Sequence, residues 1–151
     1  MAHKESPSDV REGERPKCYL PGWEIFAIDS TTIPCSVKMA EWALGKYSRG
    51  GVKMRTVLDL RGSIPESIYI TDGRWHDSNF LDVHEPYKWA VYTMDKAYVD
   101  FEALYRMQRN ETYFVTRPKE TMMYEVISFI TNNIELGPLV IANIYRNRWA
   151  I

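Results

Sequence analysis

Two aspartates stand directly after apolar segments, and their carboxylates are the groups of this sequence best placed for chemistry. Asp29 follows the apolar segment 23–28, and Asp95 follows the segment 89–94. Carboxylates at the carboxyl ends of neighbouring strands emerge into one crevice. Like charges held together repel unless a cation lies between them, and hard oxygen donors suit Mg²⁺. The pattern indicates a divalent-cation site for phosphoryl transfer; the structural alternative is that each aspartate is a strand-end turn or helix cap.

The other acids fit structural roles more simply. Asp59 lies within a predicted strand, where it suits a cross-strand ion pair, and Asp72 precedes a glycine in a turn signal. Asp77 or Ser78 is the expected cap of the short helix near residue 76, and Asp100 is the expected cap of the helix at 99–108. His76 could contact phosphate or a metal, or be an ordinary structural histidine.

Basic residues concentrate between residues 37 and 62, where six bases outnumber two acids. Such a stretch could contact a phosphate backbone, although a run of charge often marks only a solvated face. The candidates for DNA contact in this stretch are Lys46, Lys53, Arg55 and Arg61. Arg146 and Arg148 form a second basic site, or they simply complement the dipole at the end of the last helix.

Strands paired locally and then alternating with helices must position these residues. Apolar, β-branched and alternating patterns predict strands at 23–29, 52–60, 66–71, 89–94, 112–116 and, more weakly, 127–131. Helical patterns cover 39–44, a short segment from residue 76, 99–108 and 139–151. The segments 52–60 and 66–71 form a hairpin around a turn at 61–63. This order predicts an α/β fold with a mixed sheet flanked by helices.

Length and composition agree with one globular domain. The chain has 151 residues, of which 45% are hydrophobic and 26% charged, with a net charge of −1. Residues 1–22 are polar and rich in charge, and we expect a flexible leader there. No apolar run is long enough to span a bilayer, and no signal peptide is visible. Two cysteines provide no disulfide or metal framework, so a reduced cytoplasm is expected.

Six segments, which follow one another in the order of the family's motifs, together resemble bacterial insertion-sequence transposases of the DDE type with a Y-x2-R-x3-E motif. They are a first-Asp motif at 27–33, a basic hairpin at 51–62, a block ending in His-Asp at 70–77, a second-Asp motif at 94–100, a strand at 113–117 and the start of the last motif at 145–151. Each piece alone is weak, but their order over residues 24–151 is specific.

The resemblance implies a ribonuclease-H-like catalytic domain over residues 23–151, incomplete at its last helix. It implies Asp29 and Asp95 as ligands of Mg²⁺ or Mn²⁺, with Tyr145 and Arg148 as supporting catalytic-site residues. The implied activity is metal-dependent DNA strand cleavage and strand transfer. The implied DNA partners are transposon ends and target DNA. The implied protein partner is a second copy of the chain or a full-length transposase. The implied location is the nucleoid of a bacterial cytoplasm, with no membrane association.

Two departures from the family pattern shape the functional expectation. The spacing from Tyr145 puts the catalytic glutamate one position after Ile151, and only a short connection separates residues 117 and 131. We therefore expect a truncated, inactive transposase fragment. The alternatives are a regulatory remnant that binds DNA or transposase without catalysis, and a product with no selected function.

Overall fold

The computed structural model describes residues 22–36, 50–119 and 129–149. Its strands are β1 (Ile25–Cys35), β2 (Gly50–Asp59), β3 (Ile64–Asp72), β4 (Val91–Met94), β5 (Tyr113–Thr116) and β6 (Ile130–Thr131). Its helices are α1 (Phe80–Val83), the single 3₁₀ turn η2 (Lys96–Tyr98), α2 (Phe101–Arg109) and α3 (Pro138–Asn147). The predicted helix at 39–44 and nearly all of the predicted leader lie outside the described residues.

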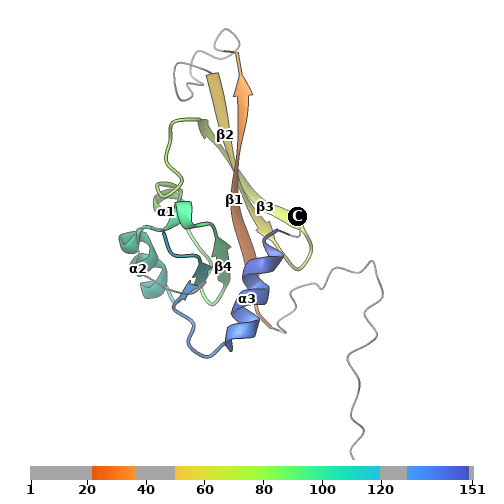
Figure 1. Ribbon diagram of the computed structural model, residues 1–151, viewed down its shortest axis with the longest axis vertical. Helices are drawn as coiled ribbons and strands as arrows, with labels where there is room; N and C mark the ends of the chain where they lie inside the picture. Colours follow the sequence, from red (N-terminus) through yellow and green to blue (C-terminus); the bar gives the residue numbers. More distant parts are fainter. Residues whose placement is uncertain (1–21, 37–49, 120–128, 150–151) are drawn as a thin grey trace, which may run out of the picture.

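The six strands form one mixed sheet in the order β3-β2-β1-β4-β5-β6 (Figure 1). The first three strands pair antiparallel, β1, β4 and β5 run parallel, and β6 returns antiparallel. Parallel neighbours need crossover connections, which here contain α1 and α2. This is a ribonuclease-H-like arrangement and confirms the fold class expected from the sequence.

The hairpin of β2 and β3 is confirmed and is longer than the alternating pattern predicts. Its turn places Ser63 at φ 54°, in the left-handed region. The register between the two strands shifts between Val57 and Leu58, which is a bulge. The far parts of β1 and β2 project beyond the helices (Figure 1). Residues 31–34 of β1 are accordingly exposed.

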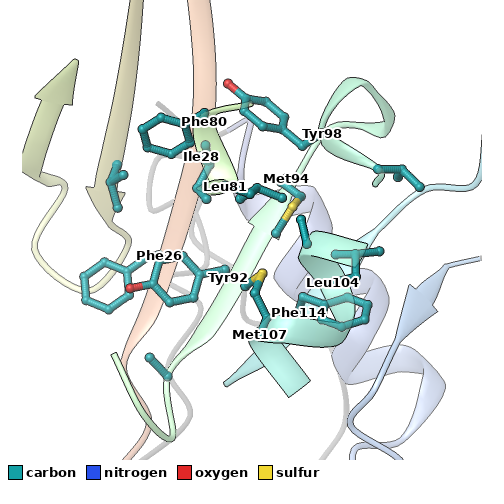
Figure 2. Packing of buried hydrophobic residues seen from close by; sticks show 14 residues of the cluster. Phe26, Ile28, Phe80, Leu81, Tyr92, Met94, Tyr98, Leu104, Met107 and Phe114 are labelled. Carbon is teal, nitrogen blue, oxygen red and sulfur yellow. The ribbon is translucent and has the colours of Figure 1, made fainter. Parts of the chain in front are cut away.

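Each face of the sheet is covered by a different set of helices, because successive strand residues point to opposite sides. On one face, Phe26 and Ile28 of β1 share a core with residues of α1 and α2 (Figure 2). On the other face, Ile25 and Ala27 share a core with residues of α3. Asp29, the candidate site residue of β1, therefore follows a segment that is packed into a core on each face of the sheet.

Helix boundaries follow local capping chemistry. Asp100 caps α2, since its carboxylate accepts hydrogen bonds from the backbone N–H groups of Glu102 and Ala103. The cap predicted for α1 was wrong. Asn79 is its N-cap residue, and Asp77 points elsewhere. The last helix ends at Asn147 instead of continuing as the pattern predicts. Among the described helices, none combines the length and apolar character needed to cross a bilayer.

Candidate active site

The parallel pairing of β1 and β4 brings the two predicted carboxylates to neighbouring positions in the middle of the sheet. Asp95 directly follows β4, as predicted, whereas β1 does not end at Asp29 but continues to Cys35. Ile28 of β1 lies opposite Met94 of β4, and each is followed by an aspartate. Both preceding residues are fully buried, so the backbone of each aspartate is anchored in the core. The side chains of Asp29 and Asp95 are 49% and 36% exposed. The fold thus presents two anchored carboxylates, side by side, at a surface that water and a ligand can reach.

Arg148 joins the two carboxylates across 119 and 53 residues of sequence. Its Nη1 donates to Asp29 Oδ1 at 3.2 Å, and its Nη2 donates to Asp95 Oδ2 at 3.4 Å. The arginine side chain is only 1% exposed. Because each end of the guanidinium serves a different aspartate, the two carboxylates face one shared cationic group.

Aromatic rings fix the position of that guanidinium. Its central carbon lies 5.2 Å from the ring centroid of Tyr145 and 4.1 Å from that of Trp149. Tyr145 is buried and packs against Phe129. Both rings come from α3 or the turn after it, so the helix that covers one sheet face also delivers the arginine. Cation–π contacts of this kind favour a charged group that is withdrawn from water.

Tyr98 of η2 lies close beneath the carboxylates but is held neutral. Burial raises the pKa of its hydroxyl, and the charges of Asp77 and Asp29 add to this increase. Its ring belongs to the core cluster of Figure 2, beside Phe80 and Met94. Its buried ring is therefore part of the core and not of the exposed site.

The donor set suits a hard divalent cation. Carboxylate oxygens are ligands that Mg²⁺ and Mn²⁺ accept. Asp29 and Asp95 already share one cationic group, the Arg148 guanidinium. In the described part of the chain, no cluster of three or more metal-ligating side chains occurs. Two protein carboxylates, completed by water or substrate oxygens, are therefore what this part of the chain offers.

The basic residues predicted to contact DNA do not form one surface. The structure corrects the role of Arg55, whose side chain is completely buried. It donates to Asp77 Oδ1, Thr71 Oγ1 and the Trp75 carbonyl, and it lies over the Trp75 ring at 4.6 Å. A phosphate cannot reach this guanidinium in the folded protein.

The remaining basic candidates differ in their surroundings. Lys53 is 15% exposed and forms a 2.6 Å ion pair with Asp77. Arg61 is 40% exposed but pairs with Asp59 at 2.8 Å, while Arg146 is exposed on α3. Lys46 lies outside the described residues. Only Arg61 and Arg146 of these candidates are therefore seen at the surface.

Arg117 is a further basic residue near the two aspartates that the sequence patterns did not indicate. Arg117 is exposed and directly follows β5, which runs parallel to β4 with Thr93 opposite Val115. Two residues further along each strand, Asp95 and Arg117 therefore leave the sheet at the same level. The sequence signal for Arg117 is the same as that for Asp95, because a charged residue directly follows a buried strand.

Comparison with known proteins agrees with this arrangement. The family model described as "Transposase DDE domain" matches residues 21–151. The curated protein named "Putative transposase y4zB", from Sinorhizobium fredii (strain NBRC 101917 / NGR234), is 32% identical over 100 residues. That alignment covers 66% of this chain and 28% of the relative, so the chain matches a minor part of the relative's length. The match over residues 21–151, on a ribonuclease-H-like sheet, shows that the chain belongs to the transposase DDE domain family.

Proposed function

We propose that this chain forms the carboxylate-bearing part of a transposase catalytic core, which cleaves DNA strands and transfers them with the help of Mg²⁺ or Mn²⁺. One observation carries the proposal: Asp29 and Asp95, from adjacent parallel strands, share a single cation, Arg148. A pair of partly exposed carboxylates that share one cation beside the carboxyl end of β4 is suited to holding a catalytic metal ion.

Each residue of the site has a role in this proposal. Asp29 and Asp95 hold the metal, which supplies activation of the attacking oxygen and stabilisation of the leaving oxygen in phosphoryl transfer. Arg148 brings positive charge to the two carboxylates, and Tyr145 positions it. Arg117 and Arg146 are exposed and are offered as contacts to the DNA backbone.

Metal-dependent stabilisation tests the proposal without requiring catalysis. A ligand at one hundred times its dissociation constant stabilises a folded protein by about 2.7 kcal/mol. For a domain of this size, that raises the melting temperature by roughly 5–10 °C. We expect Mn²⁺ to produce such an increase in the wild-type protein and to produce little in Asp29→Asn or Asp95→Asn.

Asp82→Asn is the matched control, because Asp82 is 58% exposed and pairs with Arg106 away from the site. It should respond to Mn²⁺ as the wild type does. A wild-type protein that melts cooperatively at the same temperature with and without Mn²⁺ would refute the proposed metal site. A plasmid-nicking assay with the same variants then asks whether the chain as given carries strand cleavage.

A binding role without catalysis is the alternative, and its DNA-binding form rested on Lys53 and Arg55. Arg55 is buried, and Lys53 is held by Asp77, so neither favours that form. The protein-binding form, which needs a second copy or a full-length transposase, is tested by sedimentation of the chain alone and with that partner.

A further inference from the structure

The charges of the carboxylate site are arranged in an unusual way, with the cation inside and the anions outside. The Arg148 side chain is 1% exposed, whereas those of Asp29 and Asp95 are 49% and 36% exposed. An arginine with so little exposure needs partners, because removing a charge from water is costly. Its Nε is buried and has no hydrogen-bond partner among the described residues. Arg148 therefore depends on the two aspartates and on aromatic stacking.

The contacts that hold Arg148 are loose. Hydrogen bonds between a charged nitrogen and a carboxylate are usually 2.7–2.9 Å long, but those of Arg148 are 3.2 and 3.4 Å. Neither aspartate receives the bidentate fork that makes arginine–carboxylate pairs strong. One positive charge is shared between two negative charges, so the guanidinium by itself does not neutralise the pair of carboxylates.

Arg148 lies in the turn that follows α3 and not in the helix itself. It lies one residue beyond α3 and is followed by Trp149, whose ring is 64% exposed. The turn there is held by bonds from the Arg148 and Trp149 N–H groups to the Tyr145 and Arg146 carbonyls, at 3.3 and 3.1 Å. The Arg148 side chain is therefore attached to a turn and not to the body of α3.

We infer that Arg148 is the resident counter-ion of the metal-free site and that it competes with the divalent cation for Asp29 and Asp95. This inference rests on the proposed metal site. Without metal, the guanidinium keeps the two carboxylates from repelling each other. When the carboxylates bind a divalent cation, the guanidinium withdraws and becomes a free donor for an anion such as a phosphate. The exchange couples formation of the metal site to release of a positive charge beside it.

Competition predicts two opposite effects of removing the arginine charge. Metal-free protein becomes less stable, because two half-exposed carboxylates are left without their shared cation. Metal affinity rises, because the competitor is gone. An arginine that only supports the fold would produce the loss of stability without the gain in affinity, so the metal dissociation constant distinguishes the two roles.

Calorimetric titration with Mn²⁺ alone measures that constant. We expect Arg148→Met to bind Mn²⁺ at least tenfold more tightly than the wild type while melting at a lower temperature in the absence of metal. Arg109→Met is the matched control, since Arg109 is an exposed arginine at the end of α2 to which no part of the site is assigned. The Mn²⁺ dissociation constant of this control should stay within about twofold of the wild-type value. That result would show that the loss of one positive charge does not by itself tighten Mn²⁺ binding.

Arg148→Lys keeps the test open if the methionine variant does not fold. A single ammonium group cannot span both aspartates as the guanidinium does, so we expect at least threefold tighter Mn²⁺ binding. Unchanged or weaker binding by the folded Arg148 variants, with clear binding by the wild type, overturns the competition but leaves the metal site standing. No binding by any folded variant or by the wild type overturns the metal site and the competition together.

Discussion

Replacing Arg55 by methionine is expected to lower the free energy of unfolding of this protein substantially. In the sequence, Arg55 is only one of several bases in a charged hairpin. The guanidinium is completely buried and donates to a carboxylate, a hydroxyl and a carbonyl. These three contacts tie β2 to the end of β3 and to the segment that leads to α1. Methionine fills much of the same volume but leaves all three acceptors without this donor.

The magnitude follows from these contacts. A hydrogen bond with a charged partner contributes about 1.5–3 kcal/mol, and breaking a buried ion pair costs about 3–5 kcal/mol. Asp77 keeps its 2.6 Å contact with Lys53, which reduces the loss. We therefore expect Arg55→Met to lower the free energy of unfolding by about 3–4 kcal/mol. At roughly 2–4 °C per kcal/mol for a domain of this size, the melting temperature falls by about 10 °C.

Urea unfolding followed by tryptophan fluorescence measures this loss, and Arg61→Met is its control. Arg61 is an arginine of the same hairpin but is 40% exposed, and its pairing with Asp59 is expected to contribute less than about 1 kcal/mol. If Arg55→Met and Arg61→Met cost the same small amount, the network around Asp77 is not a stabilising element and the reasoning fails.

Three further outcomes are expected. Burial lowers the pKa of His84 below its ordinary value of 6.5, so the stability present above that value is lost as the pH falls below it; His84→Gln should flatten the change in melting temperature from pH 7 to 5.5, and an equally steep change would contradict this. Asp100→Ala removes the acceptor of two N–H groups and should cost about 1 kcal/mol, whereas Asp100→Asn should cost clearly less, as read from urea midpoints. Ile68→Thr and Ile70→Thr change side chains that are 53% and 61% exposed on the edge strand β3, so light scattering should show less aggregation at an unchanged melting temperature; a large drop in that temperature would mean that this face is covered.

The carboxylate pair could be anticipated because it depends on local rules. An apolar segment that ends in an aspartate is readable in one dimension, and parallel pairing of two such segments brings their ends together. The Asp100 cap and the hairpin of β2 and β3 were readable for the same reason, since both depend on residues a few positions apart. The short helix α1 was less predictable, because Asp77, its expected cap, is taken by Lys53 and Arg55.

What the sequence determined by itself is the set of strands along the chain and the two carboxylates that follow buried apolar segments, because these follow from periodicity and turn chemistry. What only the tertiary structure decided is which charges are withdrawn from water. In β2, Lys53 and Arg55 lie on the side of the strand opposite Met54, because successive residues alternate. A strand side that carries such charged residues is normally expected to face solvent. Here the segment carrying Trp75 and Asp77 covers that side and buries the arginine. Burial of Arg148 likewise depends on α3 reaching across the sheet, over a distance in sequence that no local pattern encodes.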